Sequence, residues 1–214
     1  MSTQLKALVI GTAQEEARYH PLEPVAPLLG DILARAGFAE VVTTTDLDAL
    51  RHERLREFDL CVSYLDMWEQ QLNAAQVAGI LQCTASGQGF LAIHSGISCE
   101  NMAYRHLVGA RFVEHPPYQA FAVQISDRGH PVTQGLADFT IEDELYICEF
   151  VQPNDLHFLA MGVIGEKRHP IAWVRPFGLG RVAYLALGHS APSFQNDGFA
   201  QMVASAARWC SRAQ

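Results

Sequence analysis

Five polar positions in this chain carry the residue types that most often do chemistry in proteins. They are His20, His94, His115, the adjacent pair Asp143-Glu144, and His189. Imidazole and carboxylate groups together suit two tasks: holding a divalent metal ion through nitrogen and oxygen ligands, and transferring protons near neutral pH. The sequence contains neither a His-Glu-x-x-His nor a His-x-His motif, so the fold would have to bring these side chains together.

His94 lies in the tightest turn that the sequence predicts. The apolar run Gly89–Ile93 is typical of a buried strand, and it passes directly into the polar, permissive turn His94-Ser95-Gly96. Such a break lifts one side chain out of a sheet at the carboxyl ends of its strands, where open α/β sheets form their sites. In the nucleophile elbow of hydrolases and amidotransferases the lifted residue is Ser or Cys. A histidine there keeps the scaffold of an acyl-transfer enzyme and removes its nucleophile.

His20 and His189 also follow predicted strands. His20 lies in the loop after the first apolar run, at residues 5–10, and His189 closes a second one, at 184–188. If these strands and the one before His94 are parallel, all three histidines come to the same edge of the sheet. His115 precedes two prolines, which stiffen its loop.

The two acids at 143 and 144 interrupt a strand-like run at residues 140–147. Successive strand residues point to opposite faces, so at most one of the two carboxylates would face a pocket. Both could instead be exposed at a β-bulge. Each histidine likewise has a plain structural explanation, as a residue hydrogen-bonded in the core or exposed on the surface.

Ser95, next to His94, suggests a hydrolase, but that chemistry also needs an oxyanion hole. The turn after the third predicted strand, residues 63–68, contains no glycine, whereas amidotransferases of this topology use a glycine-rich turn there. Asp66 and Trp68 in this turn could instead line a pocket, because tryptophan beside carboxylates is a common sugar-binding surface. Trp68 could equally serve only for packing.

Predicted strands alternate with predicted helices in the first half of the chain, and strands follow one another with few helices in the second half. This order predicts an α/β fold with a doubly wound, mostly parallel sheet and an antiparallel extension in the C-terminal half. Parallel strands are expected at 5–10, 41–45, 58–64 and 90–93, and further strands at 121–125, 139–147, 157–163, 171–174 and 181–187. Helices are expected at 21–36, 72–85, 101–108 and 199–209, with a short helix or turn at 47–56. No linker or repeat divides residues 1–214, so one domain is the economical interpretation.

Composition excludes several classes of function. The net charge of -8, without a Lys/Arg block, disfavours nucleic-acid binding. No apolar run approaches the roughly 20 residues needed to cross a membrane. Five cysteines without a Cys-x-x-Cys spacing argue against a disulfide framework and a cysteine zinc knuckle, which makes the cytoplasm the simplest location. Homo-oligomerisation stays open.

The chain resembles the ThuA-like family of trehalose-utilisation proteins over roughly residues 5–210. The resemblance is carried by an ordered set of segments: Gly87 to Ser95, Leu107 to Phe112 with His115-Pro116, His130-Pro131-Val132 with Gly135-Leu136, Asp143 to Tyr146, Pro170 to Trp173, and Gly178 to His189. The first loop departs from the pattern, because it reads Gly11-Thr12-Ala13-Gln14-Glu15-Glu16 where many relatives have a Gly-Gly-His-like turn.

The resemblance implies a fold like the class I glutamine amidotransferases (flavodoxin-like) with a rebuilt active site, and chemistry on sugars or keto-sugars. It favours Glu144 over Asp143 as the acid of the site. We therefore expect His94, His189 and Glu144 to be catalytic, and His20, His94, His115 and His189 to be candidate ligands of a divalent metal, zinc or manganese. Asp66, Trp68, Ser95 and Asp143 are expected to line the substrate pocket.

Three hypotheses compete on these observations. The first is an enzyme, not a glutaminase, that acts on a sugar, keto-sugar or disaccharide by His/Glu acid–base or metal-assisted chemistry of the lyase, isomerase or hydrolase type. The second is a non-catalytic sugar-binding or assembly module on the same fold, since fold does not imply function. The third is a structural subunit whose histidines only hydrogen-bond internally.

Overall fold

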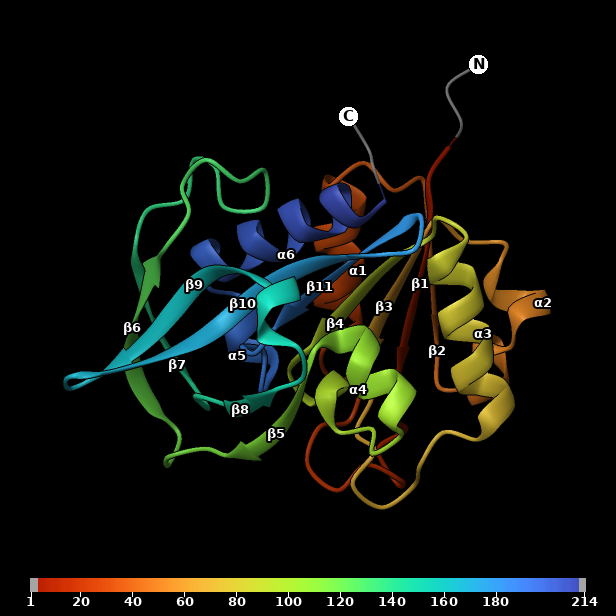
Figure 1. Cartoon of the computed structure of the whole chain (residues 1–214), viewed down its shortest axis with the longest axis horizontal. Helices are drawn as coiled ribbons and strands as arrows, with labels where there is room; N and C mark the ends of the chain where they lie inside the picture. The colour runs from red at the N-terminus through yellow and green to blue at the C-terminus, as the bar shows by residue number, and fades with distance from the viewer. Residues whose placement is uncertain (1–3, 212–214) are drawn as a thin grey trace.

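The computed structural model describes residues 4–211, and within them the main sheet has nine strands (Figure 1). Its parallel half contains five of them: β1 (Lys6–Gly11), β2 (Glu40–Thr44), β3 (Leu60–Tyr64), β4 (Gly89–Ile93) and β11 (Gly180–Leu185). They lie in the order β2-β1-β3-β4-β11, and each neighbouring pair is parallel. Residues of β1, β3 and β4 are apolar almost throughout, as expected for strands that are covered on both faces.

The antiparallel half continues from β11 with β10 (Lys167–Phe177), β9 (His157–Ile164), β6 (Gln119–Ile125) and β7 (Phe139–Asp143). A separate antiparallel ribbon pairs β5 (Ala110–Glu114) with β8 (Ile147–Phe150). The predicted fold class, a mostly parallel α/β sheet with an antiparallel C-terminal extension, is confirmed.

Helices cover the sheet in two groups. The six α-helices of residues 4–211 are α1 (Ala26–Arg35), α2 (His52–Leu55), α3 (Ala74–Ala85), α4 (Met102–Val108), α5 (Ala191–Phe194) and α6 (Asp197–Cys210), and short 3-10 turns lie at η1 (Leu47–Leu50), η2 (His94–Ile97) and η3 (Pro153–Asp155). Helix α1 contacts α5 and α6, whereas α3 contacts α2 and α4. The alternation of strand and helix along the chain produces this doubly wound arrangement (Figure 1).

Several predicted boundaries move for local reasons. The helix expected at 72–85 begins only at Ala74, because the Asn73 side chain caps it and Gln76 completes a capping box. The helix expected at 21–36 begins at Ala26, since the chain from Pro21 first runs beside Thr12. The strand expected at 139–147 is two strands, β7 and β8, and the β5 strand was not predicted at all.

The carboxyl ends of β1 and β4 lie together at the bottom of the view in Figure 1, and the β5–β8 ribbon lies beside them. The turn η2 directly after β4 contacts both β3 and β5. The ribbon therefore brings a chain segment that is distant in sequence against the edge of the sheet where a site is expected. No helix within residues 4–211 is both long enough and apolar enough to cross a lipid bilayer.

Candidate metal centre

His94 is held in a strained turn at the end of β4. Its φ of +45° lies in the left-handed region, which a residue with a side chain adopts at a cost of roughly 1–2 kcal/mol. Two contacts fix it there: Tyr184 Oη donates to the His94 carbonyl oxygen at 2.9 Å, and the Nδ1 atom of His94 lies 2.7 Å from the carbonyl oxygen of Ala186. That oxygen can only accept, so Nδ1 carries the proton and Nε2 is left with a lone pair.

The Nε2 atom of His94 is buried and has no hydrogen-bond donor among the described residues. Burial is the main reason that the pKa of His94 lies below its ordinary value. The ring is therefore neutral near pH 7, and its free lone pair points toward the Oε2 atom of Glu144 at 3.4 Å. A buried lone pair facing a carboxylate oxygen is unfavourable without a shared proton or a cation.

His20 is positioned by the buried carboxylate of Asp66. The backbone nitrogens of Tyr19 and His20 donate to Asp66 Oδ2 at 2.8 Å each, and the Nδ1 atom of His20 lies 3.2 Å from the same oxygen. Burial opposes the charged ring, but the contacts with Asp66 and Glu144 outweigh it and raise the pKa of His20. Its Nε2 atom lies 3.1 Å from Nδ1 of His189. A histidine oriented by a carboxylate behind it is the usual arrangement around protein metal ions.

Asp143 organises the loop that carries His189. It accepts hydrogen bonds from the backbone nitrogens of Glu144 at 2.7 Å, Gly188 at 2.8 Å and His189 at 3.1 Å. Gly188 has a φ of +113°, a conformation that favours glycine, and its carbonyl oxygen accepts from Tyr64 Oη at 2.8 Å. The end of β7 and the loop after β11 are thus locked together, and both Glu144 and His189 leave this junction toward His94.

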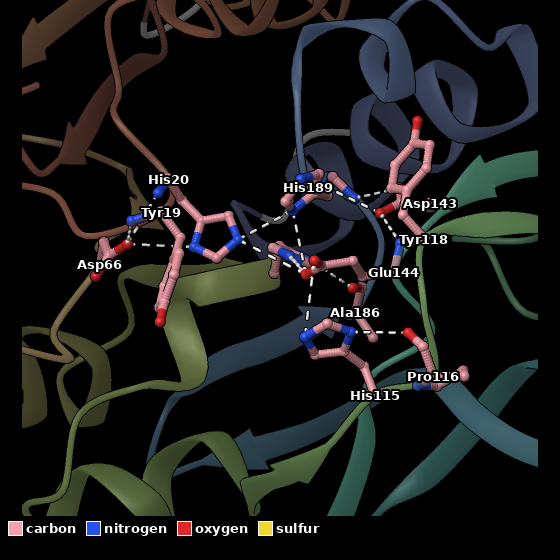
Figure 2. A network of polar contacts seen from close by, with 12 residues as sticks. Tyr19, His20, Asp66, His115, Pro116, Tyr118, Asp143, Glu144, Ala186 and His189 are labelled. Atoms are coloured by element: carbon pink, nitrogen blue, oxygen red, sulfur yellow. Dashed lines mark hydrogen bonds and ion pairs between the residues drawn. The ribbon is translucent and has the colours of Figure 1, made fainter.

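Glu144 lies at the centre of the cluster. Its Oε2 atom is 3.1 Å from His189 Nδ1 and 3.9 Å from His20 Nε2, in addition to the contact with His94. Figure 2 shows its carboxylate between the rings of His20, His189 and His115. Although burial opposes ionisation, the contacts with His189, His20 and His94 hold the pKa of Glu144 well below its usual range.

The geometry of this cluster fits a divalent metal. One ligand atom from each of His20, His94, Glu144 and His189 lies within 4.8 Å of every other. A tetrahedral zinc ion with bonds of about 2.0–2.1 Å would space its ligands roughly 3.4 Å apart, which is close to the distances found here. Three imidazole nitrogens and one carboxylate are a donor set that zinc and similar metals accept.

His115 lies outside this group of four. Its Nδ1 atom donates to the Pro116 carbonyl oxygen at 2.8 Å, and its Nε2 atom lies 3.7 Å from Oε1 of Glu144, the carboxylate oxygen that does not face His94. About a third of its side chain is exposed, whereas those of His20 and His94 are buried. Of the four histidines predicted as ligands, the structure brings His20, His94 and His189 together around Glu144, the acid predicted for the site, and His115 lies beside this group.

A cavity of about 510 Å³ opens beside the cluster. His20, Glu144, His115 and Trp68 contribute to its lining, together with four residues that were not predicted: Arg18, Tyr19, Phe112 and Tyr146. Its wall is strongly aromatic, because Phe112 packs against both Trp68 and Tyr146, with ring centroids 5.2 and 4.5 Å apart. Phe112 comes from β5, and Tyr146 directly precedes β8. The unpredicted ribbon therefore supplies much of the cavity.

The pocket prediction needs correction for three of its four residues. Trp68 lines the cavity, whereas Asp66, Ser95 and Asp143 do not. All three are almost completely buried. Asp66 and Asp143 are occupied by backbone donors, and Ser95 has already turned inward within η2. Both acids at 143 and 144 serve the site, since the chain leaves the strand after Asp143 and the strand alternation no longer applies.

Comparisons with known proteins agree with this architecture. The model of a family described as ThuA, trehalose utilisation, matches residues 6–210. No curated protein is significantly similar to the chain in sequence.

Among solved structures, a protein described as ThuA-like from Parabacteroides merdae has a TM-score of 0.83 at 17% identity, covering 99% of this chain and 91% of its own. A second protein described as ThuA-like, from Bacteroides uniformis, has a TM-score of 0.79 at 21% identity, covering 97% and 91%. A protein described as a GMP synthase component from Thermoplasma acidophilum has a TM-score of 0.57 at 13% identity, covering 98% and 97%. At these identities the likeness concerns the fold alone.

Proposed function

Because this chain belongs to the ThuA (trehalose utilisation) family, which supports a general role in carbohydrate utilisation, we propose that it is an enzyme that acts on a sugar or keto-sugar. A divalent metal, zinc or manganese, is held by His20, His94, Glu144 and His189. One observation carries the proposal: the buried Nε2 atom of His94 has no hydrogen-bond partner among the described residues and lies 3.4 Å from Oε2 of Glu144. A cation between them would satisfy both atoms.

The outer contacts of the cluster also favour a metal over purely acid–base chemistry. Asp66 orients His20, and the Ala186 carbonyl orients His94, so that in each ring Nε2 is the atom directed at the centre. A ring that exchanges protons with a substrate needs access to it, but His94 is completely buried and does not line the cavity. Histidine nitrogens that are buried, held in place by a second hydrogen bond and directed at one common point are typical of metal ligands.

Held by these four residues, a divalent metal that accepted a sugar oxygen as a fifth ligand would supply Lewis acidity that polarises a carbonyl or hydroxyl group of the substrate. The chain's own residues do the rest. Trp68 and Phe112 offer aromatic surface to the C–H face of the sugar ring, and Tyr146, whose ring packs between those of His94 and His115, backs this wall and helps to exclude water. His115 faces the cavity with Nε2 free to accept a proton, since its Nδ1 donates to Pro116. It would take the proton from the carbon next to the carbonyl. Returning that proton to the neighbouring carbon completes an isomerisation, and donating it to an oxygen substituent that leaves the β-carbon completes a β-elimination.

Glutaminase chemistry is not supported. The elbow position that would carry the nucleophile is His94, and the nearest cysteine along the chain, Cys99, is buried. Burial raises the pKa of the Cys99 thiol, which disfavours the reactive thiolate.

The test combines metal content with turnover. We expect the purified protein to contain about one equivalent of zinc or manganese by elemental analysis, and to convert keto-disaccharides in a manner that is lost on chelation and restored by metal. His94→Ala and His189→Ala should each abolish both properties while the protein stays folded. The matched control is His52→Ala, since His52 lies on α2, outside the cluster.

Full turnover in either cluster variant would refute the mechanism. Stoichiometric sugar binding without turnover, in a protein that contains no metal, would instead identify a binding module on this fold.

A further inference from the structure

A second cavity adjoins the first, and His115 contributes to both. It measures about 280 Å³ and lies between the end of β5, the segment that joins β7 to β8, and the β9–β10 hairpin. Binding sites for small molecules usually measure about 300–1,000 Å³. The first cavity falls within that range and the second just below it, so the second is better suited to extend a site than to form one.

The segment at 144–147 is the partition between the two cavities. Glu144 and Tyr146 line the first cavity, whereas Leu145 and Ile147 line the second, so successive side chains of this segment lie on opposite sides of it. Leu145 is fixed in this orientation by close packing, because a Cβ atom added at Gly162 would lie 2.1 Å from its Cδ1 atom. A ligand that reached from one cavity into the other would pass His115.

The second cavity has an apolar floor and a polar rim. Leu145, Ile147 and Ile164 form the floor, and Glu114, Lys167 and His169 add charged and polar groups. No side chain among the residues at 4–211 forms a hydrogen bond or ion pair with these three rim groups. Lys167 and His169 share one face of β10, while Arg168 between them contacts Gln124 instead. Unpaired donors and acceptors around an apolar floor are what a sugar ring, with its C–H face and hydroxyl groups, requires.

We propose that the second cavity binds the second unit of a two-unit saccharide, whose first unit lies beside the metal centre in the first cavity. The linkage between the units then lies against His115. This inference rests on the proposed function, because it takes the first cavity as a sugar site. It adds that the substrate is a disaccharide or glycoside and not a free monosaccharide, and it makes the β9–β10 hairpin a determinant of specificity.

Two variants separate the second cavity from the metal centre. Ile164→Trp enlarges a side chain that lines the second cavity, at the last residue of β9. Lys167→Met removes a rim charge, and Arg168→Met is its matched control on the other face of the strand. Calorimetric titrations of the metal-loaded protein would use trehalose, its mono-keto derivative, glucose and the corresponding keto-glucose.

We expect the wild-type protein to bind a disaccharide about tenfold more tightly than its monosaccharide, the gain typical of one or two hydrogen bonds to charged groups. Ile164→Trp should reduce that ratio to within about twofold while leaving monosaccharide affinity and metal content unchanged. Lys167→Met should lower disaccharide affinity, and Arg168→Met should not.

Equal affinities in the wild-type protein, or an unchanged ratio in Ile164→Trp, would overturn the second subsite while leaving the metal centre and the first sugar site in place. Failure of every saccharide to bind the metal-loaded protein would overturn the proposed function, and the subsite with it.

Discussion

The Nε2 atom of His94 lies 3.4 Å from the Oε2 atom of Glu144, and this nitrogen has no hydrogen-bond partner among the described residues. The ring proton of His94 is on Nδ1, where the Ala186 carbonyl accepts it, and the pKa of Glu144 lies well below its usual range because three histidines surround it. The two residues come from segments 50 positions apart, each fixed by its own hydrogen bonds. Because both side chains are fixed and both present electron pairs, a cation bound between Nε2 of His94 and Oε2 of Glu144 would stabilise this arrangement.

Glu144→Gln tests this relationship most directly. Glutamine keeps the shape of the side chain but removes the negative charge, so we expect zinc affinity to fall by more than about 100-fold, which exceeds the usual effect of losing an outer-shell partner. A competition titration against a chromogenic chelator would measure it. The control is Glu142→Gln, an exposed carboxylate two residues earlier, on β7. Equal zinc affinity in the two variants would remove Glu144 from the ligand set.

Asp66→Asn tests the outer contact that orients His20. An asparagine oxygen can still accept from the backbone of Tyr19 and His20, but it lacks the charge that favours the proton on Nδ1. We expect zinc affinity to fall by about 10–100-fold with little change in fold. Asp31→Asn, on the exposed side of α1, is the control and should bind zinc as the wild type does. Wild-type affinity in Asp66→Asn would mean that packing alone orients the ring.

The sequence predicted the parts of the site that depend on the parallel strands. His94 and His189 follow apolar runs that can only be buried strands, and parallel strands end at one edge, so their meeting is a consequence of the topology. His20 could be predicted for the same reason, although its loop departs from the family pattern. Asp143 and Glu144 were singled out as an interruption of a strand.

The remaining parts depend on contacts between distant segments, which local patterns do not encode. Residues 110–114 alternate too weakly to indicate a strand, and they form one only because β8 pairs with them. The aromatic wall from Phe112 and Tyr146 was missed for that reason. Asp66 was expected to line the pocket, but its carboxylate accepts a hydrogen bond from the backbone nitrogen of His20. A sequence does not show whether a carboxylate faces a ligand or the protein backbone.

Acid stability offers a test away from the metal centre. The backbone nitrogens of Gly129 and His130 donate to Asp127, and His157 lies 2.9 Å from its other oxygen. These contacts, the Gly129 bond first, lower the pKa of Asp127 in the folded protein. Its stabilising effect is therefore present above the unfolded value of about 3.9 and is lost as the pH falls through the folded value.

Asp127→Asn should make the acid limb of the stability curve shallower, as measured by urea unfolding between about pH 2 and 5, which spans the unfolded pKa of about 3.9 and the lower range in which the folded pKa lies. Asp31→Asn should leave the slope unchanged. An identical slope in Asp127→Asn would show that the contacts seen here do not persist in solution.

Asp143→Ala should be the most destabilising of these changes, although Asp143 lies outside the cavity. The variant leaves the backbone N–H groups of Glu144, Gly188 and His189 without their acceptor in a buried place, and each unsatisfied donor costs about 1–3 kcal/mol. We expect the free energy of unfolding to fall by about 3 kcal/mol or more, with Asp143→Asn intermediate because one oxygen remains. Urea unfolding should be measured on chelator-treated protein, since a bound metal adds stability of its own. A loss below about 1 kcal/mol would show that water replaces the carboxylate, and that the junction between β7 and the His189 loop is more open than the structure indicates.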